Sequence, residues 1–294
     1  MNLLVTGATG FLGSRATTLL RERGHDVLAV TRPGSAKRVQ TQGAADARVD
    51  AGDPGARRLI AGRDAVLHFA GVPDPARGRA DPAQTIRENV GTTLNLLEGC
   101  REHRAALIYP STVRAAAAPP PDPYAFSKRL GELTCELHDA PATVVRLTSV
   151  FGPGQVAWEG ATGAIATFAA RAIEGCPIVI PGDPDRTRDF LYVDDLVPAL
   201  EQIIVEARWD ESLTLASGVS TSLLSAAELA REAAQSKSPI ETPGGNLPSG
   251  ENESYEVDPK RPRLHFPTRP LKEAVQIYVE WLTRHPAAEG RTRA

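Results

Sequence analysis

Cysteine is scarce in this chain, which has only three among 294 residues, Cys100, Cys135 and Cys176. Three scattered thiols make neither a disulfide framework nor a metal-ligand spacing, so we expect no metal site and reduced thiols in a cytoplasmic protein. No apolar run reaches the length of a membrane span, and the first residues carry a glycine turn instead of a signal-peptide cleavage site. Secreted disulfide-rich proteins and integral membrane proteins are therefore not expected.

An excess of charge is also absent, because 33 Lys and Arg stand against 36 Asp and Glu, a formal charge of −3. We expect neither nucleic acid nor an anionic membrane as a partner. Aromatic residues make up 5% of the chain and hydrophobic residues 41%, which is ordinary for a soluble globular protein. The length suits a large α/β domain with a smaller partner.

The N-terminal stretch combines an apolar strand, residues 3–5, with a glycine-rich turn into an amphipathic helix. Gly7 permits the turn, Gly10 lets a pyrophosphate approach the backbone, and Gly13 lets helix and strand pack closely. The helix N-terminus offers N–H groups and a partial positive charge to that phosphate. We predict a dinucleotide site, with a plain strand–turn–helix as the alternative. The cofactor residues assigned here are Gly7, Thr9, Gly10, Phe11, Leu12 and Gly13.

The second predicted strand, residues 26–31, ends without the carboxylate that holds a free ribose 2′-hydroxyl in dinucleotide-binding folds. Arg32 stands there instead and can pair with a 2′-phosphate, with Ser35 and Lys37 assisting. We therefore predict NADP(H) in preference to NAD(H). A solvated basic loop is the alternative.

Two further strand ends complete the predicted cofactor site. Residues 48–51 are predicted as a third strand, with Asp50 and Ala51 at the adenine end, although a surface aspartate is nearly as good an interpretation of Asp50. A fourth strand and its exit, residues 64–71, end in small residues that let the cofactor lie against backbone. Phe69, Ala70 and Gly71 are assigned to the cofactor there. His68, within this apolar run, is predicted to be a packed core histidine.

A long helix is predicted over residues 82–103 from its apolar spacing, after a loop at 72–82. Asn89 in this helix is expected to bridge backbone near the active site. A fifth strand, residues 106–109, leads to Ser111 and Thr112. Since ligands bind beyond the carboxyl ends of parallel strands, these hydroxyls stand where chemistry is expected.

A proline-rich loop then leads to a helix that begins near Tyr124 and runs to about residue 138. Tyr124 and Lys128 are four residues apart and share a helix face. Lys128 can hold a cofactor ribose and lower the phenol pKa by its charge, which a phenol needs to act as an acid–base at neutral pH. A surface Tyr/Lys pair is the alternative, but the glycine turn and the hydroxyls favour catalysis.

The remainder of the chain suggests a second domain. Further strands are predicted at 143–148, 177–180 and 212–216, further helices at 165–174, 196–207, 222–234 and 270–284, and a mobile polar stretch at 236–254. We predict an α/β fold with a doubly wound parallel-sheet Rossmann core and a smaller mixed α/β substrate-binding domain. The core would comprise 1–154 and about 186–212, the substrate domain 155–185 and about 213–284, and 285–294 a disordered tail.

These features together resemble the extended short-chain dehydrogenase/reductase family, in its nucleotide-sugar epimerase, dehydratase and ketoreductase branch, over nearly the whole chain. The specific matches are Tyr124-x-x-x-Lys128, Asn89-Val90-Gly91-Thr92 and the run from Arg188 to Asp195. The resemblance implies the following roles: Tyr124 as acid–base, Lys128 as its tuner and ribose ligand, Thr112 beside the substrate oxygen, Ser111 near the nicotinamide, Ser149 in the substrate site and Arg188 at the phosphates of a sugar nucleotide.

The resemblance also implies a homodimer in which the helices near Pro82 and Tyr124 form a four-helix bundle with a second copy. The apolar residues offered to it are Ile86, Val90, Leu94 and Leu97 on one helix and Leu130, Leu133 and Leu137 on the other.

Three departures from the family pattern bear on function: the loop at 113–123 is short, Ser149 replaces the usual asparagine, and the acid after the second strand is missing. The last favours exchangeable NADPH over a tightly held NAD. We predict an NADPH-dependent ketoreductase of a nucleotide-linked keto(deoxy)sugar. The alternatives are a nucleotide-sugar epimerase or dehydratase, a reductase of a small apolar carbonyl compound, and a non-catalytic NADP-sensing protein.

Overall fold

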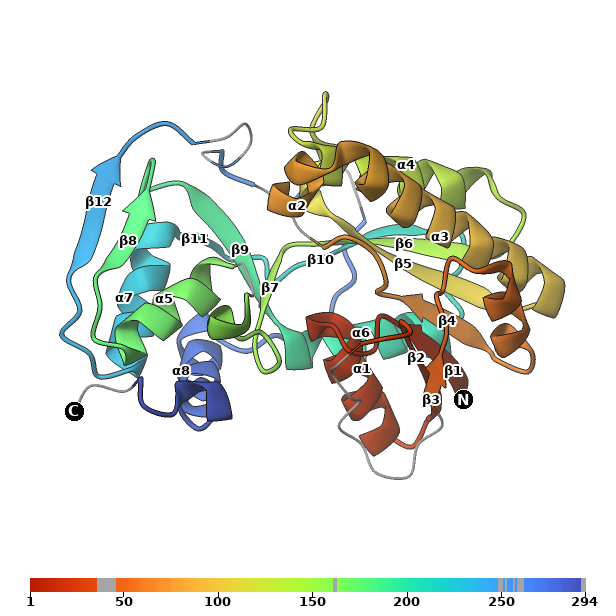
Figure 1. Cartoon of the computed structure of the whole chain (residues 1–294), viewed down its shortest axis with the longest axis horizontal. Coiled ribbons are helices and arrows are strands. Elements are labelled where there is room, and N and C mark those ends of the chain that lie inside the picture. Colours follow the sequence, from red (N-terminus) through yellow and green to blue (C-terminus); the bar gives the residue numbers. More distant parts are fainter. Residues whose placement is uncertain are drawn as a thin grey trace. The chain divides into compact units, whose positions relative to one another are not determined.

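The computed structural model describes residues 1–35, 46–73, 75–160, 163–247, 251, 253–255, 257 and 262–291 (Figure 1). The chain forms two compact units, each built from separate stretches of sequence. The first unit contains Met1–Leu147, Leu196–Leu215 and Asp258–Leu264, and the second contains Thr148–Asp195, Ala216–Val257 and His265–Ala294.

The first unit is built on a parallel sheet, which in the described part of the chain has seven strands in the order β10-β6-β5-β4-β1-β2-β3. Its strands are β1 (Asn2–Thr6), β2 (Asp26–Thr31), β3 (Asp46–Arg48), β4 (Ala65–His68), β5 (Ala106–Thr112), β6 (Ala142–Leu147) and β10 (Ser212–Leu215). The order runs outward from β1 in one direction and from β4 in the other. That reversal is where ligands bind in such sheets, and it confirms the predicted doubly wound fold.

The central strands are apolar because helices cover both faces of the sheet. Leu3, Leu4 and Val5 of β1 are at most 1% exposed. The covering elements are α1 (Phe11–Glu22), α2 (Pro75–Ala80), α3 (Pro82–His103), α4 (Pro123–Leu137), α6 (Val193–Val205) and the short 3₁₀ helices η1 (Pro54–Ile60) and η2 (Val113–Ala116). α3 and α4 pack side by side (Figure 1).

Local capping explains where the two long helices begin. Asp81 accepts a hydrogen bond from the Gln84 N–H at 2.9 Å, and Pro82 occupies the first turn of α3. Asp122 caps α4 in the same way, and Pro123 follows it. α3 has the predicted bounds.

Two local predictions in this unit were wrong. The third strand ends at Arg48 and does not extend over 48–51, because its register with β2 stops there. Residues 75–80, predicted as loop, form α2, since packing on α3 and α4 supports a helix too short to stand alone.

The second unit contains two small sheets and three helices among its described residues. The sheets are β11-β9-β7, from β7 (Ser149–Phe151), β9 (Thr187–Tyr192) and β11 (Ser220–Ser222), and β12-β8, from β8 (Ile178–Pro181) and β12 (Ile240–Gly244). The helices are α5 (Ala164–Ile173), α7 (Leu223–Ala233) and α8 (Leu271–Thr283), with η3 (Ala157–Glu159) and η4 (Pro286–Ala288). Residues 186–195, predicted in the core domain, lie here because β9 pairs with β7 and β11.

Two segments of this unit are more ordered than predicted. The stretch predicted as mobile, 236–254, contains β12, which pairs in parallel with β8. The predicted disordered tail contains η4, where Ala288 is 3% exposed and its N–H donates to the His285 carbonyl at 2.8 Å. Residues 292–294 lie outside the described residues.

Aromatic rings form the centre of the second unit's core. Phe151 contacts Phe190, Tyr192 and Tyr278, with ring centroids 6.4, 5.6 and 6.0 Å away. The Tyr278 hydroxyl donates to the Gln155 carbonyl at 2.5 Å, so this buried phenol keeps a hydrogen-bond partner.

All three cysteines are free, and burial raises the pKa of both Cys100 and Cys135 to about 12. Within the described ranges, no helix is both long enough and apolar enough to cross a membrane.

Candidate cofactor and catalytic site

The glycine turn after β1 is a cradle that side chains would fill. Gly7 has φ +64°, and a Cβ there would lie 2.6 Å from the Phe69 carbonyl carbon. A Cβ on Gly13 would lie 2.3 Å from the Gly7 carbonyl oxygen. α1 begins at this turn, and its N-cap Gly10 supplies no side-chain cap. Backbone N–H groups at such a helix start suit a pyrophosphate, so the residues present fit a dinucleotide.

A buried hydrogen-bonded chain links β1, β4 and α3 behind this turn. The Thr93 hydroxyl donates to the Asn89 carbonyl at 2.7 Å, so its oxygen is left to accept from His68 Nε2 at 3.1 Å. The Ala70 N–H donates to Thr6 Oγ1 at 3.1 Å, and Thr6 lies 3.0 Å from His68 Nδ1. A neutral His68 protonated on Nε2 satisfies every member. Burial, with the nearby charge of a lysine, lowers the pKa of His68 to about 3, which confirms it as a core histidine.

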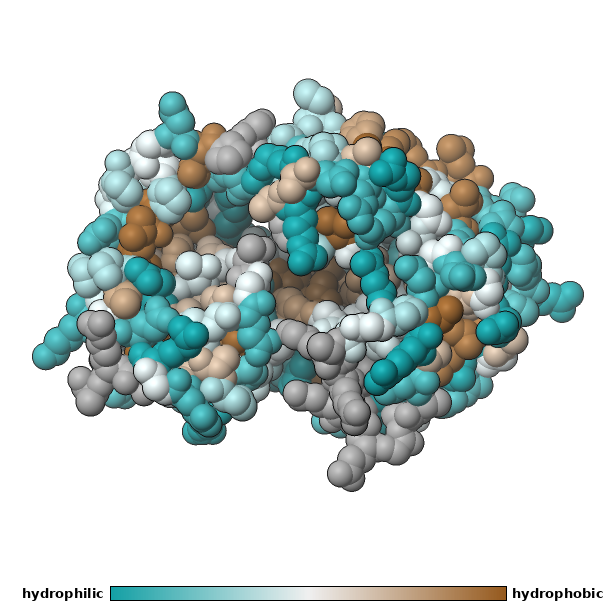
Figure 2. Space-filling model, viewed as in Figure 1, coloured by the Kyte–Doolittle hydropathy of each residue, from teal (hydrophilic) through white to brown (hydrophobic). Residues whose placement is uncertain are grey.

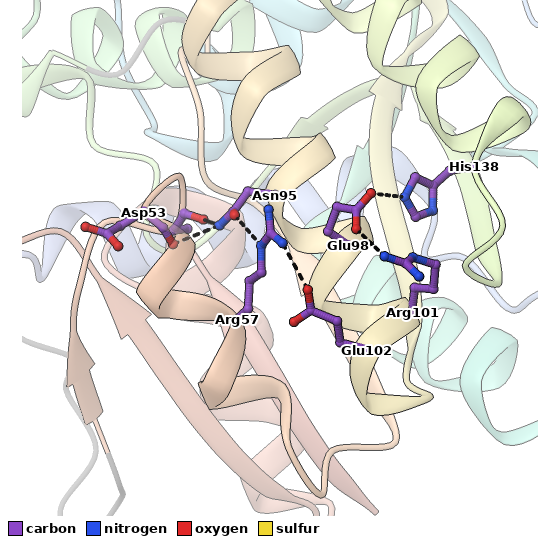
Figure 3. Close-up of polar contacts among 8 residues, drawn as sticks. Asp53, Arg57, Asn95, Glu98, Arg101, Glu102 and His138 are labelled. Atoms are coloured by element: carbon purple, nitrogen blue, oxygen red, sulfur yellow. Dashed lines mark hydrogen bonds and ion pairs between the residues drawn. The ribbon is translucent and has the colours of Figure 1, made fainter.

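Figure 3 shows how α3 holds the loop that follows β3. The Asn95 Nδ2 donates to the carbonyls of Ala51 and Asp53 at 2.8 and 2.9 Å, and Arg57 Nε donates to Asn95 Oδ1 at 2.8 Å. Asp50, at the predicted adenine end, accepts the Gly52 N–H at 2.9 Å. Asn95 therefore fixes the backbone of a predicted cofactor loop, a role that its spacing in the helix did not reveal.

Arg32, the residue predicted to hold a 2′-phosphate, has a carboxylate partner in this structure. Its guanidinium lies 2.8 Å from Glu88 on α3. Ser35 Oγ donates to Thr9 Oγ1 at 3.4 Å, which joins the end of β2 to the glycine turn. Lys37 lies outside the described residues.

Lys128 extends from α4 to the end of β5. Its Nζ donates to the Pro110 carbonyl at 2.8 Å and lies 4.9 Å from the centre of the Tyr109 ring. Burial lowers the pKa of Lys128 to about 8. This places the ammonium beside the strand end that carries Ser111 and Thr112.

Tyr124 is held by its backbone at the start of α4. Its carbonyl accepts from Ser127 Oγ at 2.8 Å, and Ser127 accepts from Asn89 Nδ2 at 2.8 Å. Asn89 Oδ1 accepts the Val72 N–H at 2.7 Å, so it bridges backbone as predicted. From α2, a Cβ on Gly78 would lie 2.9 Å from the Tyr124 nitrogen. α2 therefore packs directly on Tyr124, and α3 is linked to it through Ser127.

A buried ion cluster supports the same strand end. Ser111, 4% exposed, donates to Glu132 at 2.6 Å, and Arg146 makes two hydrogen bonds to Glu132 at 2.7 and 2.6 Å. Burial opposes ionisation of Glu132, but bonds from Arg146, Ser111 and Arg129 outweigh it and lower its pKa. Sequence reasoning missed Glu132, although its place one helical turn after Lys128 continues the face of Tyr124 and Lys128.

Thr112 is the last residue of β5 and caps η2, where its Oγ1 accepts the Arg114 N–H at 3.3 Å. The first unit thus brings together the glycine turn, the ends of β2 to β5 and the start of α4, which carry all but two of the predicted site residues.

Ser149 and Arg188, the predicted substrate residues, belong to the second unit. Ser149 on β7 is in register with Phe190 on β9. Arg188 on β9 donates to the carbonyls of Thr187 at 2.8 Å and Glu251 at 3.3 Å, and its guanidinium lies 4.7 Å from the Tyr255 ring centre. A stacked guanidinium held by carbonyls keeps a fixed orientation.

Comparison with known proteins decides the family. The model of the NAD dependent epimerase/dehydratase family matches residues 3–212. The chain belongs to this family. The resemblance to extended short-chain dehydrogenases/reductases is thereby confirmed, and with it the prediction of an NAD(P)-dependent enzyme.

Relatives cover nearly the whole chain. A dTDP-glucose 4,6-dehydratase of Streptomyces griseus is 28% identical over 97% of this chain and 94% of its own length. A dTDP-4-dehydro-6-deoxy-D-allose reductase of Streptomyces bikiniensis is 26% identical over 96% of each. Among solved structures, the UDP-glucose 4-epimerase of Thermotoga maritima, with UDP-glucose, has a TM-score of 0.82 and 25% identity, covering 97% of this chain and 99% of its own.

Proposed function

We propose that this enzyme is an NADPH-dependent ketoreductase that acts on a nucleotide-linked keto-deoxysugar. The observation that carries the proposal is the end of β2, where residues 27–35 contain no carboxylate and Arg32 stands at the strand end. A free ribose 2′-hydroxyl finds no acid on this strand end, whereas a 2′-phosphate finds a guanidinium. Similarity to a dTDP-sugar reductase supports reduction as the reaction.

The cofactor would lie along residues of the first unit. The glycine turn with Thr9, Phe11 and Leu12 would hold the pyrophosphate, Asp50 and Ala51 the adenine, and Phe69, Ala70, Gly71 and Ser111 the ribose and nicotinamide side. When bound, NADPH supplies a hydride to the carbonyl carbon of the substrate.

Tyr124 would then protonate the alkoxide oxygen, and Thr112 would donate a hydrogen bond to the same oxygen. Lys128, positively charged beside the strand end, would hold the ribose and keep the phenol pKa within a useful range. The second unit would bind the substrate, with Ser149 at the sugar and Arg188 at the phosphates of the nucleotide.

An epimerase or dehydratase with the same residues is the second candidate. The Arg32–Glu88 contact favours it, because a carboxylate near the end of β2 is available in this structure. The dTDP-glucose 4,6-dehydratase among the relatives is consistent with it. A cofactor that is recycled within each turnover would be held tightly as NAD.

We also propose a homodimer through α3 and α4. Leu94, Phe126, Leu133 and Leu137 are exposed by 45, 43, 37 and 86%, and Figure 2 shows hydrophobic surface over these helices at the upper right. Exposed apolar side chains gathered on one surface are typical of an interface. Leu97, which was assigned to this surface from sequence, is instead fully buried in the sheet's own core.

One experiment separates the two catalytic candidates. The purified protein is analysed for copurified dinucleotide, its oxidation state and its 2′-phosphate, and is then assayed with a panel of keto sugar nucleotides. Stoichiometric consumption of NADPH by a keto sugar nucleotide supports the reductase. Tightly bound NAD, and conversion of a sugar nucleotide without net dinucleotide consumption, would favour the second candidate.

A further inference from the structure

The connection between β5 and α4 carries its polar side chains at its two ends. Between Arg114 and Asp122 stand four alanines and three prolines, none with a side chain that can form a hydrogen bond. Arg114 and Asp122 form an ion pair, and their side chains are 12 and 1% exposed. Loss of one partner from so buried a pair leaves a charge without compensation, so the pair constrains both ends of the connection.

The main chain of Arg114 contacts the first proposed catalytic hydroxyl. Its N–H donates to Thr112 Oγ1 at 3.3 Å. Because this bond occupies the oxygen as an acceptor, the Thr112 hydroxyl hydrogen remains to be donated to another oxygen. Arg114 therefore orients the donor that the substrate oxygen would meet.

The side chain of Arg114 acts on the start of α4 through Asp122. One Asp122 oxygen, Oδ1, accepts the Ala125 N–H at 2.9 Å and caps the helix, and the other, Oδ2, contacts Arg114. Tyr124 lies between Asp122 and Ala125, at the second position of α4. The direction in which the first turn presents Tyr124 thus depends on how Asp122 is held.

We propose that Arg114 is a positioning residue for proton transfer. Its main-chain N–H orients Thr112, and its guanidinium orients Tyr124 through Asp122. The inference rests on the proposed function only in that Thr112 and Tyr124 act on one substrate oxygen. It assigns to the short connection at 113–123 a definite role, which is to fix two hydroxyl groups through one residue, Arg114, where the intervening residues have no polar side chain.

The test compares Arg114→Gln and Arg114→Lys with a control, Arg101→Gln, which breaks an exposed arginine–carboxylate pair near the C-terminal end of α3 (Figure 3). Misplacing a catalytic group by about 1 Å can cost about 100-fold in rate. We expect Arg114→Gln to lower kcat by roughly 10- to 100-fold with the KM for NADPH within about twofold. Arg114→Lys should restore most of the loss, and Arg101→Gln should match the wild type.

A second readout does not depend on turnover. The ionisation of Tyr124 is measured as the ultraviolet pH-difference spectrum of each protein minus that of its Tyr124→Phe counterpart. We expect Arg114→Gln to raise the pKa of Tyr124, because the phenol moves relative to Lys128, while Arg101→Gln leaves it unchanged. A role confined to stability would lower the melting temperature without moving this pKa.

Asp122→Asn is a second way to remove the ion pair, for the case in which the Arg114 variants do not fold. Asparagine still caps a helix but cannot form the ion pair. We expect it to reproduce the Arg114→Gln effects, and the double variant to be no worse than either single one. Wild-type kcat and an unmoved Tyr124 pKa in Arg114→Gln, or in Asp122→Asn where the former does not fold, would overturn the assignment. If the wild type reduces no keto sugar nucleotide, the proposed function fails, and the spectroscopic arm still decides the role of Arg114.

Discussion

The guanidinium of Arg32 lies 2.8 Å from a carboxylate oxygen of Glu88, which joins the end of β2 to α3. Gln84 Nε2 donates to the other oxygen of Glu88 at 2.6 Å. The side chains of Arg32 and Glu88 are 55 and 27% exposed, and such exposed pairs contribute only about 0–1 kcal/mol. A 2′-phosphate, with more charge than a carboxylate, can therefore displace Glu88 from Arg32.

Arg32→Ala should weaken NADPH binding by roughly 1–3 kcal/mol, the scale of a charge-assisted hydrogen bond, and change NADH binding little. Glu88→Gln should strengthen NADPH binding, because the competing carboxylate is removed. Fluorescence titration of both dinucleotides measures each effect. Equal affinity of the wild type for NADPH and NADH would contradict the role given to Arg32.

Tyr124→Phe should lower turnover by roughly 10²–10⁴, the usual contribution of general acid–base catalysis, while cofactor affinity and fold are kept. Thr112→Val should lower turnover more than it changes cofactor affinity. The double variant should lose less than the product of the two effects, since both hydroxyls act on one oxygen. Steady-state kinetics with the best keto substrate measures these losses of turnover. Near wild-type turnover in Tyr124→Phe would contradict the role of Tyr124 as the acid–base.

Lys128 should make stability depend on pH in a defined window. Burial lowers its pKa from 10.5 to about 8, so between these values the unfolded chain binds more protons than the folded one. The contribution of Lys128 to the unfolding free energy therefore rises as pH rises from about 8 to 10.5. The free-energy difference between the wild type and Lys128→Met, from urea unfolding of the cofactor-free proteins, should shift in favour of the wild type over this range. A pH-independent difference would contradict a lowered pKa.

Gly78→Ala should impair catalysis by displacing Tyr124, because its Cβ would lie 2.9 Å from the Tyr124 nitrogen and 3.1 Å from its Cβ. We expect a fall in kcat of roughly 10-fold or more. Gly91→Ala is the matched control: the new methyl group meets nothing within 4 Å, and alanine stabilises an exposed helix site by about 1 kcal/mol. Steady-state kinetics and thermal melts of the two variants separate the displacement of Tyr124 from the effect of alanine on helix stability. Equal kcat values for the two variants would argue against a displacement of Tyr124.

Leu137→Glu should shift the proposed homodimer towards monomer, because Leu137 is 86% exposed on α4 and a charge there opposes burial. Val219→Glu is the control, since Val219 is 59% exposed and lies in the second unit. Light scattering at micromolar concentration measures the mass. A monomeric wild type would contradict the interface.

Elements with local signals could be predicted from the sequence. The Pro82–His103 helix was predicted to its ends because apolar spacing and a proline in the first turn both lie within the segment. The shared face of Tyr124 and Lys128 was predicted from helix periodicity, and the place of Ser111 and Thr112 from the rule that ligands bind at the carboxyl ends of parallel strands. The contact of Lys128 with the Pro110 carbonyl was found only in the structure.

Features that depend on distant partners could not be predicted. β12 exists through pairing of Ile240 with Ile178, and its own composition resembles a loop. The contact between Arg32 and Glu88 joins residues 56 positions apart. Glu132 was missed because a buried carboxylate is stable only with the Arg146 and Ser111 bonds that the fold supplies.

The pairing of β6 with β10 means that the central sheet cannot be completed until late in synthesis. Residues 144–147 of β6 are matched in register by 212–215 of β10, so a nascent chain must emerge through residue 215 before that edge is covered. Until then an apolar strand presents free N–H and C=O groups, a template for pairing with another chain. A fragment ending at residue 154 would keep this edge open permanently, which makes such a fragment prone to pair with other chains.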